Sequence, residues 1–265
     1  EVEQMNLFKD MVCYQEEVRD PSRMAEVLNR VIEKAFRGSA PAQINVPRDY
    51  WTQAIDIELP PIVRFERQGG GKEAIENAAK ILSKAKFPVI LSGAGVVLGG
   101  AIDECKKLAE KLDAPVCNGY QHNDSFPGSH PLAVGPLGYN GSKAAMELIS
   151  KADVVLALGT RLNPFSTLPG YGIDYWPKKA TIIQVDVNPD RIGLTKKVSV
   201  GICGDSKQVA QQILEKLSPD AGNTGREERK NLIHKTKSAW LQTLSGLDHE
   251  EDDPGTVWNK EARER

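Results

Sequence analysis

The sequence predicts an α/β protein with a doubly wound parallel sheet, preceded by a partial α/β segment at the N-terminus. From about Lys72 to Leu217, short apolar runs of strand length alternate with stretches whose apolar residues repeat at helical spacing. Fully apolar strands are typical of parallel sheets, because helices cover both faces of such sheets. The alternation also indicates right-handed β–α–β crossovers, and hence a Rossmann-like domain.

One helix and one strand stand out before this region. Asp20 suits a helix N-cap, Pro21 the first turn and Gly38 the end of a helix over residues 20–38. A short strand over residues 41–47 follows. The pair is interpreted as the tail of an α/β unit whose earlier strands are absent. We therefore expect the helix to dock elsewhere or to be the most mobile part of the chain.

Residues 48–73 carry no helical or strand periodicity. They contain two adjacent prolines, Pro60 and Pro61, and three adjacent glycines at positions 69–71. Such a composition is typical of a linker between folded units.

The elements of the main region are predicted in chain order from apolar pattern and punctuation. They are a helix over 75–82, a strand over 88–93, a helix over 102–112, a strand over 114–118, a long loop with little regular structure over 117–141, a helix over 142–151, strands over 152–160, 180–189 and 198–205, and a closing helix over 206–217. After Leu217 the pattern fades. An amphipathic helix over 231–244 and an acidic connector over 247–258 are predicted there.

Composition excludes several function classes. The 265 residues carry a formal net charge of −2, so the chain lacks the basic excess of a nucleic-acid-binding protein. No apolar run approaches the roughly 20 residues of a membrane span, and nothing resembles a signal peptide. Four scattered cysteines indicate reduced thiols in a cytoplasmic protein. The polar, abrupt ends suggest a piece of a longer polypeptide.

Three motifs at predicted strand ends could bind a ligand. Gly93, Gly95 and Gly99 form GxGxxxG between a strand and a helix, which suits either a phosphate cradle or a tight turn that only joins packed elements. Arg161, after the strand over 152–160, could pair with a phosphate or be a surface residue. Asp186 could accept hydrogen bonds from a ribose, or it could belong to a turn at Pro189.

No metal site is predicted. His122 and His130 lie in the long loop, and neither has a second ligand at metal spacing. We find no nucleophile elbow, no HExxH and no Walker sequence, so no catalytic residue is assigned within the chain.

Five stretches resemble one enzyme family. PVILSGAG, KLAEKLDAPV, FPGSHPLAVGPLG, ADVVLALGTR and IIQVDVNPDRIG recur in this order in the central domain of thiamine-diphosphate enzymes of the acetolactate-synthase and pyruvate-oxidase type. PAQINVPRDYW resembles the end of their pyrimidine-binding domain. Along its whole length the chain is most similar to the sulfoacetaldehyde acetyltransferase branch.

The resemblance implies a domain plan. Residues 1–60 would be the last part of the pyrimidine-binding domain, 61–71 a linker, 72–217 the central domain and 218–265 the lead-in to a pyrophosphate-binding domain. The family's activating glutamate would lie upstream of Glu1 and its Mg²⁺–diphosphate motif beyond Arg265. Cys203-Gly204-Asp205-Ser206 is only a near match to that motif. The fragment alone is therefore expected to be inactive.

The resemblance also implies an activity and its cofactors. The parent would use thiamine diphosphate and Mg²⁺ to convert the small molecules sulfoacetaldehyde and phosphate to acetyl phosphate and sulfite, as a homodimer or homotetramer. Relatives hold FAD or ADP in the central domain. The counterparts of that pocket are Gly93, Ala94, Gly95, Gly138, Gly159, Thr160, Arg161 and Asp186. Leu162-Asn163-Pro164 and Tyr14-Gln15 depart from the FAD-binding branch and indicate a different substrate channel, so FAD, ADP and an empty pocket all stay open.

Overall fold

A computed structural model describes residues 2–61 and 66–245 of the chain. It divides into two compact units, Glu1–Glu66 and Arg67–Arg265. Each unit has its own hydrophobic core, and each is described by itself below.

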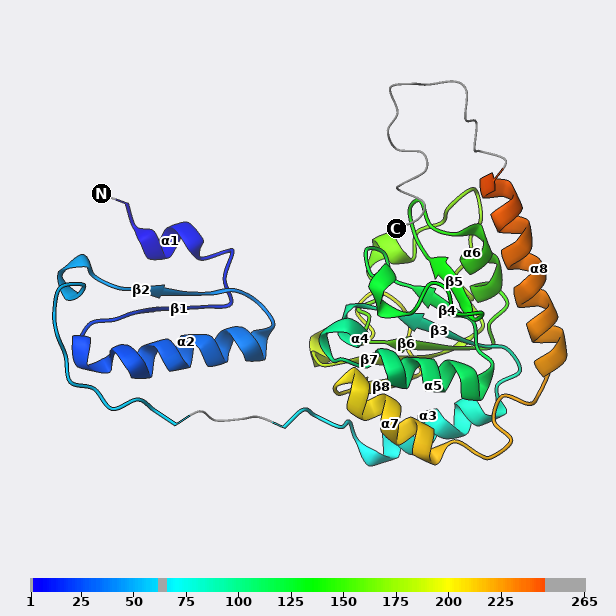
Figure 1. Ribbon diagram of the computed structural model, residues 1–265, viewed down its shortest axis with the longest axis horizontal. Helices are drawn as coiled ribbons and strands as arrows, with labels where there is room; N and C mark the ends of the chain where they lie inside the picture. The colour runs from blue at the N-terminus through cyan, green and yellow to red at the C-terminus, as the bar shows by residue number, and fades with distance from the viewer. Residues whose placement is uncertain (1, 62–65, 246–265) are drawn as a thin grey trace, which may run out of the picture. The chain divides into compact units, whose positions relative to one another are not determined.

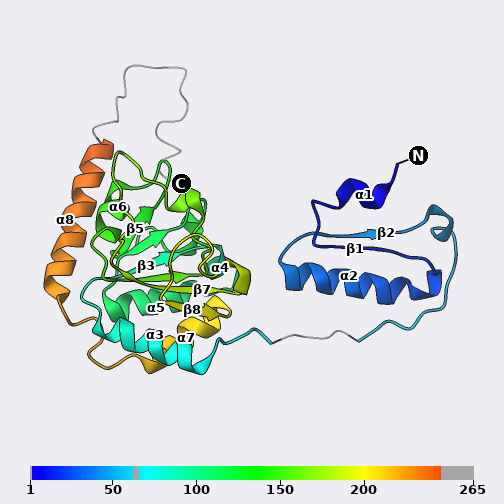
Figure 2. The same cartoon turned by 180° about the vertical axis from the view of Figure 1, so that it is seen from behind.

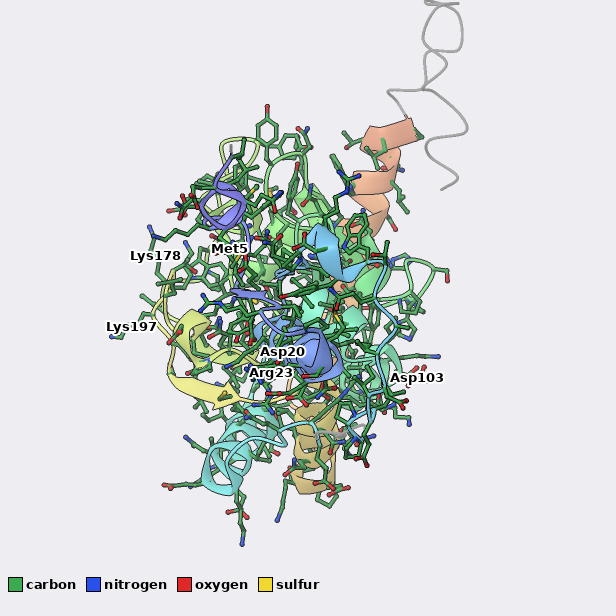
Figure 3. All side chains as sticks on the ribbon, turned by 90° about the vertical axis from the view of Figure 1, so that its left-hand side faces the viewer. Met5, Asp20, Arg23, Asp103, Lys178 and Lys197 are labelled. Atoms are coloured by element: carbon green, nitrogen blue, oxygen red, sulfur yellow. The ribbon has the colours of Figure 1, made fainter. Side chains whose placement is uncertain are left out.

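The first unit is a two-stranded parallel sheet covered by one helix (Figure 1). Its elements are α1 (Gln4–Phe8), β1 (Tyr14–Glu17), η1 (Pro21–Arg23), α2 (Met24–Gly38), β2 (Ala42–Asn45) and η2 (Arg48–Tyr50). The predicted cap is present, because the Asp20 carboxylate accepts a hydrogen bond from the Ser22 amide at 2.9 Å. Asp20 and Arg23 lie together at the start of the helix (Figure 3). A single 3₁₀ turn precedes the α-helix, which begins at Met24 rather than directly after Asp20.

The interpretation that this α/β unit lacks its earlier strands is wrong for one strand, and α2 does not dock elsewhere. β1 pairs in parallel with β2, and α2 packs against both strands around Val18, Val27 and Val31. β1 was not predicted, because Tyr14–Glu17 has the sequence YQEE, which shows no apolar alternation. Leu28 and Ile32 of the predicted apolar stripe are nevertheless exposed, so α2 is buried along only part of that stripe.

The second unit contains a six-stranded, wholly parallel sheet, and this confirms the predicted fold class. Its strands are β3 (Pro88–Ser92), β4 (Val116–Asn118), β5 (Ala133–Pro136), β6 (Val154–Leu158), β7 (Thr181–Asp186) and β8 (Val200–Cys203). The spatial order is β5-β4-β3-β6-β7-β8. The chain therefore builds outward from β3 in one direction, returns, and builds outward from β6 in the other. The reversal lies between β3 and β6, where doubly wound sheets bind ligands.

Helices cover both faces of this sheet (Figures 1 and 2). They are α3 (Lys72–Lys84), α4 (Ala94–Leu98), α5 (Ile102–Leu112), α6 (Lys143–Ile149), α7 (Ser206–Lys216) and α8 (Arg226–Ser245), with short 3₁₀ turns η3 (Asn123–Ser125), η4 (Pro164–Ser166) and η5 (Pro189–Arg191). α7 packs between α3 and α5, while α6 packs against α8. The strands β3 and β6 are buried throughout, as expected for the centre of a covered sheet.

Three elements of this unit differ from the prediction. The loop over 117–141 contains β5 and η3, so it has more regular structure than expected. β5 reads AVGP, and Gly135 with Pro136 hides a strand that forms only by pairing with β4. The helix predicted over 231–244 is part of the longer α8, and the short α4 was not predicted. The connector predicted over 247–258 lies outside the described residues.

The four cysteines divide into two environments. Cys105 and Cys117 are buried, Cys13 is exposed and Cys203 is half-buried, and all four are free thiols. Burial raises the pKa of Cys105 to about 12 and raises the pKa of Cys117 further. Because the thiolate is the reactive form, neither buried cysteine should react at neutral pH.

Thiol labelling tests this division. At pH 8 the folded chain should react rapidly at Cys13 and Cys203 only, with the other two thiols appearing in denaturant. A C13S/C203S double variant is the control and should show almost no labelling until it unfolds. Fast modification of Cys117 in the folded chain would contradict the described packing.

Candidate functional site

Two glycine-rich turns meet at the carboxyl edge of the sheet, at the point where the strand order reverses. β3 ends in the turn Gly93–Gly95, and β6 ends in the turn Gly159–Arg161. The Gly93 amide donates a hydrogen bond to the Leu158 carbonyl at 3.1 Å, and the Gly95 amide donates to the Gly159 carbonyl at 2.8 Å. The two turns are therefore bonded directly to each other.

Protein atoms fill the space beside these glycines. A Cβ at Gly93 would lie 2.6 Å from the Thr160 Cβ, and a Cβ at Gly95 would lie 2.7 Å from the Gly159 Cα. At Gly159, where φ is +62°, a Cβ would lie 2.6 Å from the Ser206 Oγ. These distances are too short for any side chain. The glycines thus allow two turns to pack together, which is the second of the two roles that the sequence left open.

Gly138 makes the closest approach of the edge. Its φ is +95°, and an added Cβ would overlap the backbone carbonyl of Phe165. The neighbouring Tyr139 amide donates a hydrogen bond to the same carbonyl oxygen at 3.3 Å. This glycine therefore holds the loop after β5 against the loop after β6.

Arg161 is the predicted site residue most available to a ligand. Its side chain is exposed and has no hydrogen bond or ion pair within the described part of the chain. Thr160, beside it, is buried, and its Oγ1 accepts a hydrogen bond from the Leu162 amide at 3.2 Å. Ala94 is the first residue of the five-residue helix α4. A free guanidinium beside a packed turn could contact an anionic group.

Asp186 belongs to a turn. It is buried, and its Oδ1 accepts a hydrogen bond from the Asn188 amide at 2.9 Å. Asn188 in turn accepts from the Asp190 amide at 2.9 Å, so the turn at Pro189 that the sequence indicated is present. The near match to the family's Mg²⁺ motif is also a structural feature. Asp205 caps α7 through the amides of Lys207 and Gln208.

Polar residues that the sequence analysis missed organise the same edge. Gln184, buried within β7, donates from Nε2 to the carbonyls of Thr160 and Arg191, and its Oε1 accepts from the Gly193 amide. The only signal in the sequence was a glutamine in the middle of an apolar strand. A buried amide of this kind must satisfy its donors and acceptor internally, so it fixes the loops after β6 and β7.

His130 has a structural role. Its Nδ1 accepts a hydrogen bond from the Leu132 amide at 3.2 Å, so Nε2 carries the proton that faces Glu110 Oε1 at 3.2 Å. Among the described residues, no group of three or more His, Cys, Asp or Glu side chains could hold a metal ion. No helix of the described residues is long and apolar enough to cross a membrane.

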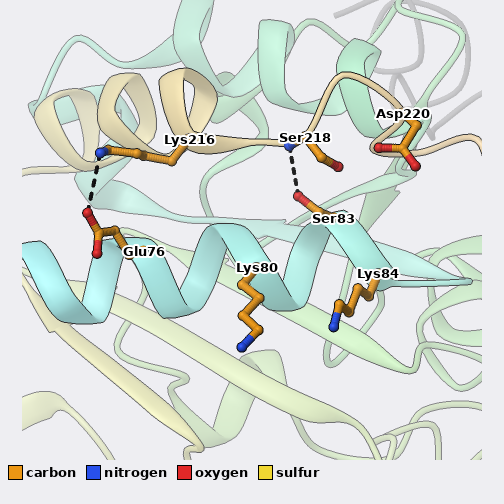
Figure 4. A pocket seen from close by; sticks show the side chains of 7 residues that line it. All are labelled: Glu76, Lys80, Ser83, Lys84, Lys216, Ser218 and Asp220. Carbon is orange, nitrogen blue, oxygen red and sulfur yellow. Dashed lines mark hydrogen bonds and ion pairs between the residues drawn. The ribbon is translucent and has the colours of Figure 1, made fainter.

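Two grooves on the second unit lie away from the edge. One, between α3 and the segment after α7, is lined by Glu76, Lys80, Ser83, Lys84, Lys216, Ser218 and Asp220 (Figure 4). Lys80 and Lys84 point away from Ser218 there, so the lysines do not converge on one ligand (Figure 4). The second groove, about 650 Å³ in volume, lies between α5 and α8 and includes Ile233 and Leu241. None of the eight predicted site residues lines either groove.

A match to a family model defines the class of protein. The chain belongs to the thiamine pyrophosphate enzymes, because residues 75–213 match the model of that family's central domain. The crystal structure of benzoylformate decarboxylase from Polynucleobacter necessarius shares the fold. It aligns with a TM-score of 0.71 at 23% sequence identity and covers 84% of this chain and 42% of that one.

Three relatives within the family show which enzymes the chain is similar to. The chain is 77% identical over 265 residues to a probable sulfoacetaldehyde acetyltransferase of Rhizobium meliloti (strain 1021), covering 100% of this chain and 45% of the relative. It is 51% identical over 95% of its length to a sulfoacetaldehyde acetyltransferase of Castellaniella defragrans, of which it covers 42%. A probable acetolactate synthase large subunit of Methanocaldococcus jannaschii is 33% identical over 93% of the chain. The chain spans less than half the length of these relatives.

Proposed function

We propose that this chain is the central part of a thiamine-diphosphate- and Mg²⁺-dependent acetyltransferase that converts sulfoacetaldehyde and phosphate to acetyl phosphate and sulfite. The observation that carries the proposal is the 77% identity, along the entire chain, to a relative named for that activity. Domain limits of 1–60, 61–71, 72–217 and 218–265, a homodimeric or homotetrameric parent and a cytoplasmic location belong to the same proposal.

The residues of this chain support a structural role for it in the longer enzyme. The described residues offer no cluster for Mg²⁺, and Asp205 is engaged in capping α7. Thiamine diphosphate bound to the parent would supply nucleophilic chemistry at the substrate carbonyl. We assign its binding to the part of the parent outside this chain. The role of the residues in this chain is to hold the sheet edge rigid through the hydrogen-bonded turns at Gly95 and Gly159.

Acetyl phosphate formation tests the proposal. A longer protein that contains this chain and both flanking regions should form acetyl phosphate from sulfoacetaldehyde and phosphate and should require thiamine diphosphate. The 265-residue chain, assayed at equal concentration, should form none. Turnover by the isolated chain, or no turnover by the longer protein, would overturn the assignment.

A second candidate function is nucleotide binding at Arg161. The observation that favours it is an exposed guanidinium with no hydrogen-bond or ion-pair partner among the described residues. Here Gly93, Ala94, Gly95, Gly138, Gly159, Thr160 and Asp186 would shape the backbone beside the ligand, and Arg161 would contact its phosphate. Millimolar ADP or FAD should then raise the melting temperature of the chain. At one hundred times Kd the stabilisation is about 2.7 kcal/mol.

The Arg161→Ala variant makes that experiment specific. Loss of the ADP or FAD shift in this variant, with an unchanged melting temperature in the absence of ligand, would support the contact. The same experiment with Arg191→Ala, in the next turn of the edge, is the matched control and should keep the shift. If millimolar ADP or FAD does not shift the melting temperature of the unsubstituted 265-residue chain, nucleotide binding is removed as a candidate function.

A further inference from the structure

Exposed apolar side chains gather on one side of the second unit. Nine large apolar side chains are exposed among its described residues, and two of them, Leu241 and Leu244, lie on α8. The other seven lie on segments that follow the carboxyl ends of strands: Leu98, Tyr139, Phe165, Leu168, Tyr171, Val187 and Leu194. Single exposed apolar residues are ordinary, but a collection at one edge marks an interaction surface.

The segments that carry these side chains are bonded into one surface. The Tyr139 amide donates to the Phe165 carbonyl at 3.3 Å, and Thr195 Oγ1 donates to the Leu162 carbonyl at 2.7 Å. The ring of Tyr120 stacks on Phe165, with 6.1 Å between centroids. We call the exposed part of this surface the carboxyl-edge patch and define it by five residues. They are Leu98, Tyr139, Phe165, Val187 and Leu194.

Backbone strain gathers in the same loops. Six described residues other than glycine have positive φ, and two of them, Ser39 and Asp113, simply end helices. The other four lie in the segments after β4, β5 and β6: Gln121, Asn140, Leu162 and Tyr171. Such conformations cost energy and persist where the surrounding structure fixes them, most often at functional surfaces.

We infer that the carboxyl-edge patch is the docking surface for another domain of the longer parent polypeptide. This inference rests on the proposed function. More than half the length of the 77%-identical relative lies outside this chain, so a further protein surface is available to cover the patch. The patch offers aliphatic and aromatic side chains with Arg161 exposed beside them, which is the composition of a protein interface with an apolar centre and a polar rim.

The geometry favours a protein over a nucleotide as the occupant of the patch. The amides of Gly93, Gly95 and Gly159 already donate to backbone carbonyls, so these three N–H groups are not free to bind a phosphate. The patch residues themselves are apolar and more than half exposed, with Leu194 at 72% and Phe165 at 57%. Covering them removes apolar area from water, which a charged nucleotide would do poorly.

Hydrogen exchange on the longer protein and on the 265-residue chain tests the inference. Peptides covering residues 137–142, 160–168 and 187–195 should exchange about tenfold more slowly in the longer protein, because docking removes these loops from solvent. Leu194→Ser in the longer protein should return their exchange to the rate of the isolated chain. Leu241→Ser, which alters a leucine of α8 that is 60% exposed, is the matched control and should leave the protection intact.

Three results would overturn the inference. One is equal exchange of the patch peptides in both proteins. Another is a dimer of the isolated chain, seen by sedimentation, that Leu194→Ser dissociates, because the occupant would then be a second copy. The third is protection of the same peptides in the isolated chain by ADP or FAD. Acetyl phosphate formation is measured separately, so patch protection without that activity would refute the proposed reaction and keep the docking surface.

Discussion

Replacing Arg229 with methionine is expected to destabilise the second unit by about 3–5 kcal/mol, because the variant leaves a buried polar pocket without its cation. Arg229 is 1% exposed and lies in the first turn of α8. Its guanidinium donates to five backbone carbonyls, those of Lys86, Leu112, Asp113, Gly222 and Thr224. All these acceptors lose their donor in the variant.

The balance of effects favours a large loss. Burial lowers the pKa of Arg229, which reflects the cost of removing the guanidinium from water, and methionine relieves that cost. Each carbonyl that stays buried without a donor costs about 1–3 kcal/mol, however, and there are five of them. The carbonyls of Leu112 and Asp113 lie at the C-terminal end of α5, where a cation is also favourable.

Urea unfolding of the chain, followed by tryptophan fluorescence, measures this effect. Lys230→Met is the matched control, since Lys230 follows Arg229 in α8, is 45% exposed and pairs with the exposed Glu227. That variant should cost less than about 1 kcal/mol, as surface ion pairs do. If the unfolding free energy of Arg229→Met lies within about 1 kcal/mol of that of the unsubstituted chain, the five hydrogen bonds do not hold α8 in place.

Replacing Gly138 with alanine is expected to destabilise the second unit by about 3 kcal/mol or more, because strain and overlap act together. The backbone at Gly138 has a φ of +95°, which L-residues rarely adopt, and the added Cβ would overlap the carbonyl of Phe165. That carbonyl belongs to the backbone, so a side-chain rotation cannot relieve the contact. The loops after β5 and β6 must separate.

Two further glycine variants separate the cost of the positive φ from the cost of the close contact with Phe165. Gly172→Ala places a Cβ at a φ of +73° with nothing within 4 Å, and it should cost about 1 kcal/mol from the backbone alone. Gly128 has neither a positive φ nor an atom within 4 Å of an added Cβ. The unfolding free energy of Gly128→Ala should therefore lie within about 0.5 kcal/mol of that of the unsubstituted chain. Similar unfolding free energies for Gly138→Ala and Gly172→Ala would show that the close approach to Phe165 carries no cost.

The sequence predicted the parts of the fold whose residues follow a local pattern. The strands β3 and β6 are continuous apolar runs, and the helices α5 and α7 carry regular apolar stripes. The local apolar pattern alone therefore identifies these four elements. β1 and β5 have no such pattern. They form because a neighbouring strand supplies hydrogen bonds, and that information is not local.

The candidate site divides in the same way. Strand ends and glycine spacing predicted that Gly93, Gly95 and Gly159 lie at one edge, but not that they pack against each other. Neither the link from Gln184 to the loops on either side of β7 nor the five bonds of Arg229 leaves a periodic signal. Each depends on partners brought close only by the folded chain. Whether the eight predicted residues bind a cofactor stays a prediction.

Isothermal titration with thiamine diphosphate and Mg²⁺ tests whether this chain is a packed scaffold and whether the catalytic cofactor is held elsewhere in the longer protein. The longer protein should bind thiamine diphosphate stoichiometrically. The 265-residue chain at the same concentration should give no binding heat, since its described residues offer no cluster for the metal and Asp205 is engaged at the start of α7. Stoichiometric binding of thiamine diphosphate by the isolated chain would contradict the account.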